Sequence, residues 1–233
     1  MSNLSMRTPH DQQVSNHAVI VLASGLSQRL GQVKQLLNKE GEPLICLMLK
    51  LALTTKPQVI IVVIPENSSA IDSAMCELSV QYSSIQTVKN TQPETGMAHS
   101  LFLGIEALSD PSLSVERVLI MGIDQILLNE THLTKLLAGR QSVVASSYHS
   151  WQDLDEASSK GAFKKDIVGL PLTIDYKVLK QWQSVLAGDK GLRHLIRGLP
   201  PSQISTVIND QLSYDIDTPE QLAYAQQKGW LDK

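Results

Sequence analysis

Residues 18–34 read AVIVLASGLSQRLGQVK, an unbroken apolar run followed by a polar segment with two glycines. The apolar run is rich in β-branched side chains, which is typical of a strand buried on both faces of a parallel sheet. Ligands of an open parallel sheet bind beyond the carboxyl ends of its strands. The stretch therefore predicts a parallel α/β sheet with a ligand-binding loop directly after its first strand.

Similar apolar runs recur along the chain at residues 59–64 and 118–123, and further strand candidates lie at 142–147, 167–174 and 204–208. Helical patterns lie between them, and the last helix begins with a capping box from Thr218 to Gln221. This alternation predicts a single three-layer Rossmann-like α/β domain with a mostly parallel sheet, over residues 18–233. We expect residues 1–17 to form a flexible N-terminal extension, and residues 148–166 a polar surface excursion.

Composition excludes several classes of protein. The formal net charge of −3 argues against nonspecific nucleic-acid binding, and we expect no nucleic-acid partner. No apolar run approaches the roughly 18 residues of a membrane helix, and the polar N-terminus lacks the apolar core of a secretion signal. Two cysteines are too few for a disulfide framework or a four-ligand zinc site. The sequence therefore predicts a cytoplasmic protein without a membrane partner.

The loop after the first strand has the chemistry of an anion site. Gly25 allows backbone N–H groups to approach an anion closely, and Arg29 and Lys34 add charges that can hold phosphate oxygens. The spacing matches neither GxGxxG nor GxxxxGK[ST], so the dinucleotide and P-loop interpretations fail. On composition alone, a plain strand-to-helix turn with two solvated cations is an equal alternative.

The pattern LASGxSxRLGxxKxLL at residues 22–37 resembles the signature loop of MobA-like nucleotidyltransferases, and within them most closely the molybdenum cofactor cytidylyltransferases. Six further pieces resemble family motifs in the same order along the chain. They are GEPL at 41–44, Asn90 with GMAHSL at 96–101 and GI at 104–105, DQ at 124–125, GLP at 169–171, GDKGLR at 188–193 and DIDTPEQL at 215–222. Guanylyl-transferring relatives usually have Gly-Gly at the position of Ala23-Ser24, so the resemblance favours cytidine.

The resemblance implies a nucleotide-diphospho-sugar transferase-like fold and a Mg²⁺-dependent reaction. A nucleoside monophosphate, CMP from CTP, would pass to a phosphorylated small-molecule acceptor, molybdopterin, with release of pyrophosphate. The implied partners are the NTP, that acceptor and a molybdoenzyme chaperone. The implied nucleotide-binding residues are Leu22, Ala23, Ser24, Gly25, Ser27, Gly31, Pro65, Asn90, Gly96 and Ser100. The implied catalytic residues are Arg29 and Lys34, the acceptor-binding residues Gly169, Pro171, Asp189 and Arg193, and the metal ligands Asp124 and Asp217, with Asp215 as a further candidate.

Each role has a structural alternative. Asp124 could only end a strand, Asp217 could only precede a helix in its favourable dipole field, and Arg193 could lie on a solvated helix face. The chain also departs from the family pattern, with Ile123 for Gly, Ile126 for Pro, Leu170 for His and Gln221 for Asp. The missing Pro is expected to loosen the loop around Asp124.

Two other functions remain open from the sequence. One is the same chemistry on a sugar or polyol phosphate, and the other is a nucleotide-binding accessory protein without turnover. Retention of both cations and both carboxylates favours catalysis, because a protein that only bound nucleotide would not need them all.

Overall fold

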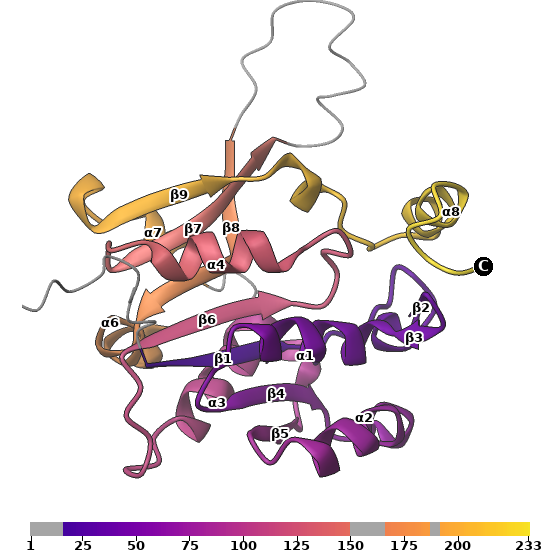
Figure 1. Cartoon of the computed structure of the whole chain (residues 1–233), viewed down its shortest axis with the longest axis horizontal. Coiled ribbons are helices and arrows are strands. Elements are labelled where there is room, and N and C mark those ends of the chain that lie inside the picture. The colour runs from indigo at the N-terminus through magenta and orange to yellow at the C-terminus, as the bar shows by residue number, and fades with distance from the viewer. Residues whose placement is uncertain (1–15, 150–165, 187–191) are drawn as a thin grey trace, which may run out of the picture.

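A computed structural model describes residues 16–149, 166–186 and 192–233. Strands and helices alternate through most of the chain, as the sequence predicts (Figure 1). The strands are β1 (His17–Leu22), β2 (Asn38–Lys39), β3 (Glu42–Pro43), β4 (Ile60–Pro65), β5 (Ile85–Asn90), β6 (Arg117–Gly122), β7 (Val143–His149), β8 (Asp166–Asp175) and β9 (Ile204–Ile208). The helices are α1 (Leu44–Thr54), α2 (Ser69–Gln81), α3 (Met97–Ala107), α4 (Glu130–Ala138), α6 (Tyr176–Trp182), α7 (Arg193–Arg197) and α8 (Pro219–Gln227).

The main sheet has seven strands in the order β5-β4-β1-β6-β8-β7-β9. β1 pairs in parallel with β4 and β6, β4 with β5, and β7 with β9. β8 is antiparallel to both β6 and β7, so β7 runs in the same direction as β6. The carboxyl ends of β1, β4, β6 and β7 therefore lie at one edge of the sheet. This confirms the predicted mostly parallel sheet and adds one reversed strand.

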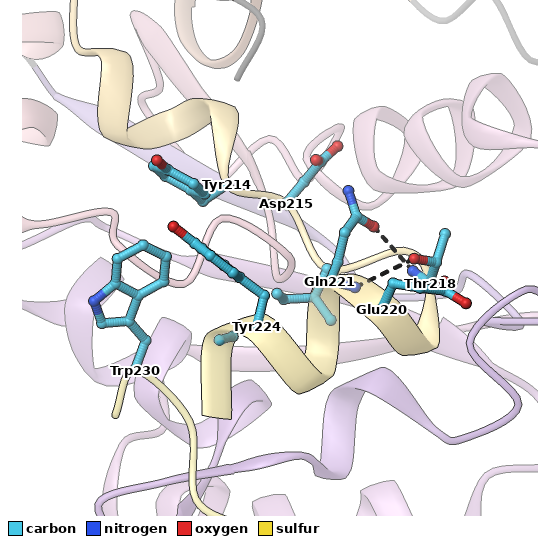
Figure 2. Close-up of a pocket in the computed structure, with 9 residues that line it drawn as sticks. Tyr214, Asp215, Thr218, Glu220, Gln221, Tyr224 and Trp230 are labelled. Atoms are coloured by element: carbon cyan, nitrogen blue, oxygen red, sulfur yellow. Dashed lines mark hydrogen bonds between the residues drawn. The ribbon is translucent and has the colours of Figure 1, made fainter. Parts of the chain in front are cut away.

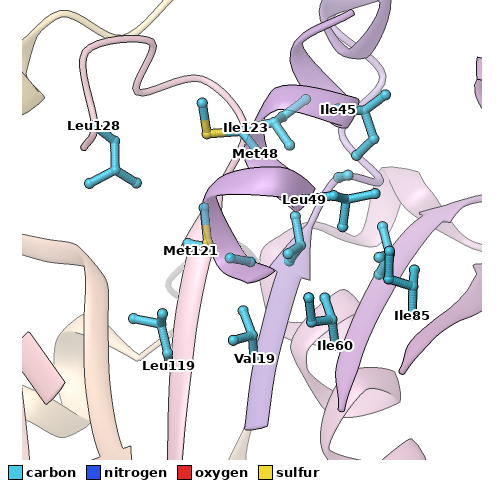
Figure 3. Close-up of a cluster of buried hydrophobic side chains, with 14 of the residues drawn as sticks. Val19, Ile45, Met48, Leu49, Ile60, Ile85, Leu119, Met121, Ile123 and Leu128 are labelled. Carbon is cyan, nitrogen blue, oxygen red and sulfur yellow. The ribbon is translucent and has the colours of Figure 1, made fainter. Parts of the chain in front are cut away.

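A hydrophobic core lies on each face of the sheet, which confirms the three-layer architecture. Val19 and Val21 of β1 face the first core, where α1, α2 and α4 pack. Figure 3 shows Val19 in this core, together with Leu49 of α1 and Leu119 of β6. Ala18 and Ile20 face the second core, where α3, α6 and α7 pack. Side chains of β1 alternate between two buried environments, and this explains why the strand is apolar at every position.

α8 is attached to the rest of the molecule by a third apolar cluster that includes Leu30, Leu44, Ile126 and Ile216. The predicted capping box is present: Gln221 N donates to Thr218 Oγ1, and Thr218 N donates to Gln221 Oε1. The packing brings the segment before α8 against the loop after β1. The C-terminal part of the chain thus completes the edge of the sheet where ligands are expected.

Several sequence expectations concern residues outside the described ranges. Residues 1–15, 150–165 and 187–191 are not described, so the N-terminal extension and most of the excursion are not tested. β1 begins at His17, one residue before the expected domain start. None of the helices in the described ranges is both long and apolar enough to span a membrane.

Candidate functional site

Two adjoining cavities lie at the carboxyl edge of the sheet. The first, of about 650 Å³, lies over the loop after β1 and the start of α3. The second, of about 590 Å³, lies between β7, β8 and α7. Leu22, Met97, Asp124 and Asp217 line both cavities. The shared wall is where two bound molecules could meet.

The loop after β1 presents unused backbone donors to the first cavity. Within the described ranges, the backbone N–H groups of residues 24–28 have no intramolecular acceptor. Ser27 adopts a left-handed conformation with φ 51°, and its carbonyl accepts from Leu30 N and Gly31 N. Free N–H groups on a turn of this kind form a concave anion-binding surface.

Gln35 holds this loop in place. Its side-chain Nε2 donates to the carbonyls of Ala23, at 2.6 Å, and Gly25, at 3.0 Å. Gln35 is buried and lines the first cavity, although no motif in the sequence points to it. In the sequence Gln35 stands between Lys34 and two leucines, and nothing in that pattern predicts its hydrogen bonds to Ala23 and Gly25.

The charged groups converge at the shared wall. The Lys34 Nζ atom lies 2.6 Å from Asp217 Oδ1 and 3.5 Å from Asp124 Oδ2. Arg29 Nη2 donates to Asp217 Oδ2 at 2.7 Å. The Lys34 side chain is only 10% exposed, whereas that of Arg29 is 72% exposed. The structure thus brings together both predicted cations and both preferred carboxylates.

These groups shift one another's ionisation. Burial lowers the pKa of the Lys34 ammonium, but the charge of Asp124 and the hydrogen bond to Asp217 outweigh burial and raise that pKa above its ordinary value. Burial also favours the neutral form of Asp217, but the hydrogen bond and charge of Lys34 and the charge of Arg29 hold its pKa below the ordinary value. Burial, followed by the charges of Asp124 and Asp217, raises the pKa of Asp215 to about 6. The effect on Asp215 shows that the three carboxylates are electrostatic neighbours.

The donor set suits a hard divalent cation. Mg²⁺ needs one or two protein carboxylates together with phosphate oxygens and water. Asp124 and Asp217 could supply the two carboxylates, and both face the positive charge on Lys34. No cluster of three or more acidic, His or Cys side chains at metal-binding distance exists among the described residues. Substrate oxygens would therefore have to complete the coordination.

The backbone around Asp124 is well held despite the missing Pro. Ile126 is fully buried in the third cluster, and Ile126 N donates to Asp124 O. Gln125 Nε2 donates to the carbonyls of Leu170 and Leu212. Burial and hydrogen bonds thus restrain the turn at which the family pattern has proline.

Gly122 makes room for the Asp124 carboxylate. A Cβ atom at position 122 would lie 2.8 Å from Asp124 Oδ1. This role is not apparent from the sequence, because the glycine ends a strand two residues before the acid and forms no motif.

A polar network lies at the floor of the first cavity. Ser24 Oγ and Ser100 Oγ are 2.5 Å apart, and Asn90 Nδ2 donates to both. Asn90 Oδ1 accepts from Gln92 N, which fixes the orientation of the amide. Asn90 is fully buried and does not line the cavity, and its amide supports the two serines that do.

The sequence-predicted residues divide into three groups. Leu22, Ala23, Ser24, Gly25, Ser27, Arg29, Lys34, Gly96, Ser100, Asp124 and Asp217 line the first cavity, and Gly169, Arg193 and Asp215 line the second. Gly31, Pro65, Asn90 and Pro171 line neither cavity. Pro171 is buried, and its carbonyl accepts from Ser146 Oγ. Asp189 lies outside the described residues.

A third pocket, of about 300 Å³, lies beside α8 and is lined by aromatic side chains (Figure 2). The ring centroids of Tyr214 and Trp230 are 4.8 Å apart, and those of Tyr224 and Trp230 are 5.8 Å apart. The capping-box residues Thr218 and Gln221 lie at its other end. Lys34 and Asp124 do not line this pocket, so it is not the site where the charged groups meet.

Comparisons with solved structures show the same fold in several proteins. The Rv0371c protein of Mycobacterium tuberculosis aligns with a TM-score of 0.68 and 21% identity, over 91% of this chain and 99% of its own. A nucleotidyl transferase from Methanothermobacter aligns with a TM-score of 0.68 and 16% identity, over 92% and 97%. A 4-diphosphocytidyl-2C-methyl-D-erythritol synthase from Anaerococcus prevotii aligns with a TM-score of 0.67 and 17% identity, over 92% and 96%.

The Mycobacterium tuberculosis protein has also been solved in complex with manganese, and that structure aligns with a TM-score of 0.63 and 19% identity, over 91% of this chain and 99% of its own. No curated protein matches the sequence significantly. The model of the MobA-like NTP transferase domain matches residues 19–206. This match covers most of the chain and confirms the resemblance seen in its motifs, so the chain belongs to the family of MobA-like NTP transferase domains.

Proposed function

We propose that this protein is a Mg²⁺-dependent nucleotidyltransferase that transfers CMP from CTP to the phosphate of molybdopterin and releases pyrophosphate. Membership of the MobA-like family supports nucleotidyl transfer as the reaction type. The observation that carries the proposal is the position of Lys34 between Asp124 and Asp217, on the wall that the two cavities share.

The charges of the site match the demands of the reaction. An oxygen of the acceptor phosphate forms a bond to the α-phosphorus, and the bond from that phosphorus to the pyrophosphate oxygen breaks. Both reacting groups are anionic, so positive charge is needed on each side of the displacement. The free N–H groups of residues 24–28 and the exposed Arg29 would bind the β- and γ-phosphates. Lys34 would stabilise charge that develops at the α-phosphate.

Asp124 and Asp217 would hold the Mg²⁺ ion, which, when bound, neutralises phosphate charge as a Lewis acid. A phosphate nucleophile is already ionised near neutral pH, so the chain needs no general base.

Two features support the choice of substrates. Ser24 is buried at the floor of the first cavity and fills space that a glycine would leave open, which favours a small pyrimidine base. The second cavity combines apolar side chains, among them Leu101, Ile120 and Leu172, with charged ones. An apolar wall beside charged groups suits an acceptor that carries a ring as well as a phosphate, such as molybdopterin.

The test is a pyrophosphate-release assay. The protein is incubated with Mg²⁺, each of the four NTPs in turn, and molybdopterin, with ribitol 5-phosphate and glycerol 3-phosphate as competing acceptors. We expect release that requires CTP and molybdopterin together. Release with a polyol phosphate instead would reassign the acceptor, and no release with any NTP would favour a nucleotide-binding protein without turnover.

A further inference from the structure

Three donor side chains lie on the wall of the second cavity and have no role in the nucleotide half of the site. Tyr148 comes from β7, and Arg193 and Arg197 come from α7. The two arginines are four residues apart, so they lie on the same side of the helix. Arg193 is already a candidate acceptor-binding residue, whereas Tyr148 and Arg197 are not.

The fold places Tyr148 at the ligand-binding edge. β7 runs in the same direction as β6, so the end of β7 lies at the same edge of the sheet as Asp124. Tyr148 is the last but one residue of that strand, and its ring packs against the first hydrophobic core. Because the ring is anchored in this way, the hydroxyl is presented to the cavity with little freedom to move.

The Tyr148 hydroxyl is left uncovered on its cavity side. A Cβ atom at Gly169, on the neighbouring strand β8, would lie 3.8 Å from Tyr148 Oη, and the glycine leaves that space open. Among the described residues, no group forms a hydrogen bond with Tyr148 Oη. The hydroxyl is therefore available to a ligand.

The surrounding charges determine which ligand the hydroxyl would meet. Burial, followed by the charge of Asp215, raises the pKa of Tyr148, and the charge of Arg193 acts in the opposite direction. At neutral pH Tyr148 is thus a protonated donor that feels the charges of one cation, Arg193, and two carboxylates, Asp215 and Asp124. Two guanidinium groups and a phenol donor together favour an anion, and phosphate accepts hydrogen bonds from all three.

We propose that Tyr148 and Arg197 join Arg193 in holding the phosphate of the acceptor substrate, with Tyr148 Oη donating a hydrogen bond to a phosphate oxygen. This inference rests on the proposed function, because it takes the second cavity to be the acceptor site. The charges of Arg193 and Arg197 would reduce the repulsion that Asp124, Asp215 and Asp217 exert on an anion in the same cavity, and Tyr148 would add a hydrogen bond.

Inorganic phosphate is the probe. Calorimetry measures its binding to the full chain, both alone and after loading with Mg²⁺ and a non-hydrolysable CTP analogue. Tyr148→Phe and Arg197→Gln should each weaken phosphate binding about tenfold, the usual loss for one hydrogen bond to a charged group, and leave the affinity for the CTP analogue unchanged. Tyr82→Phe is the matched control, because Tyr82 follows α2 on the surface away from both cavities, and it should bind phosphate like the wild type. Thermal melting verifies that each variant is folded.

Two results would overturn the inference: phosphate binding by Tyr148→Phe that equals that of Tyr82→Phe, or a wild type that binds the CTP analogue but no phosphate. Failure of the proposed function gives a different pattern, in which the wild type binds no nucleotide. In that case the phosphate titration of the nucleotide-free protein still tests the role of Tyr148. Weaker phosphate binding by Tyr148→Phe than by Tyr82→Phe would support the anion site.

Discussion

Lys34 is a buried cation held by two carboxylates, and this arrangement determines what its removal should do. In the absence of substrate its charge offsets the repulsion between Asp124 and Asp217. With nucleotide bound, the same charge would act on the α-phosphate, where negative charge grows in the transition state. An interaction that strengthens in the transition state raises turnover more than it strengthens substrate binding.

Lys34→Ala should therefore lower kcat by about 10²- to 10³-fold, the range for loss of one preorganised electrostatic group, and raise KM for the NTP far less. Steady-state kinetics with varied NTP would measure both constants. Lys177→Ala removes an exposed lysine of α6 and should leave them unchanged. A variant with normal kcat and only a raised KM would exclude the role given to Lys34.

Asp124→Asn keeps the shape of the side chain and removes its charge. We expect it to abolish most Mg²⁺-dependent turnover and to leave the fold intact, because the side chain is 37% exposed and makes no hydrogen bond that the backbone depends on. Initial rates over a Mg²⁺ titration are the measurement, with Asp72→Asn, a surface partner of Lys89, as the control. Full activity of Asp124→Asn at every Mg²⁺ concentration would rule out the metal assignment.

Gly122→Ala tests the same carboxylate without altering it. The new Cβ would lie 2.8 Å from Asp124 Oδ1, so the flexible end of the aspartate has to move. We expect turnover to fall at least about tenfold, since a displacement of about 1 Å at a reacting group is enough to cost 10²-fold. The melting temperature should change little, because the atom that moves is at the end of a side chain. Unchanged turnover would mean that the exact place of Asp124 is unimportant.

At the scale of elements, the position of α3 fixes much of the nucleotide cavity. Gly96 and Met97 at its start and Ser100 in its first turns line that cavity. The helix packs closely on β1 because Gly104 has no side chain: a Cβ there would lie 2.8 Å from Ile20 Cγ2. One glycine in the middle of a helix thus sets how near the ligand-contacting residues come to the loop after β1.

Gly104→Ala should destabilise the protein by about 1–3 kcal/mol, because overpacking at a β-branched core residue outweighs the gain of up to about 1 kcal/mol in helix propensity. Urea denaturation gives the change in free energy of unfolding. In the double variant with Ile20→Ala, the cost of Gly104→Ala should largely disappear, since the clashing atoms are gone. Additive effects of the two substitutions would show that the contact does not limit the packing.

In the whole molecule, one buried hydrogen-bond network joins segments that lie far apart in the sequence. His132 of α4 is 3% exposed and its Nε2 lies 2.8 Å from Ser146 Oγ on β7, which donates to the carbonyl of Pro171 on β8. Ser146 uses its proton on that carbonyl, so His132 Nε2 must carry a hydrogen and donate it. Burial, followed by the charge of Lys135, lowers the pKa of His132 from 6.5 to about 4.

Since the fold favours neutral His132, its contribution to stability is complete above pH 6.5 and is lost as pH falls towards 4. The loss amounts to roughly 3 kcal/mol. The raised pKa of Asp215, about 6, works in the opposite direction over the same range, so the two must be separated by a variant. His132→Gln keeps a donor but does not titrate. Urea denaturation from pH 7 to pH 4 should therefore show the stability of the variant rising towards pH 4 relative to that of the wild type, by roughly 3 kcal/mol. Equal slopes for the two proteins would mean that His132 is not the group responsible.

Many of the strands and helices could be predicted, because burial determines which positions of a strand or helix are apolar. β1, β4 and β6 are covered on both faces, so they appear as unbroken apolar runs. The last helix is marked by Thr218 and Gln221, whose capping bonds join neighbours in sequence. β5 and α2 were not predicted, because β5 lies at the edge of the sheet with exposed polar residues and α2 buries only three side chains.

The site is a different matter, because its contacts join residues far apart in the chain. Lys34 and Asp217 belong to separate motifs, and the two residues are 183 positions apart in the sequence. Their contact depends on how α8 packs in the third apolar cluster. The support that Asn90 gives to two serines, and the exposure of the Tyr148 hydroxyl in the second cavity, leave no periodic or local pattern at all. The sequence pattern predicts which faces of a helix or strand are buried. It does not predict which side chains meet across the molecule, because those contacts form only when the separate cores pack together.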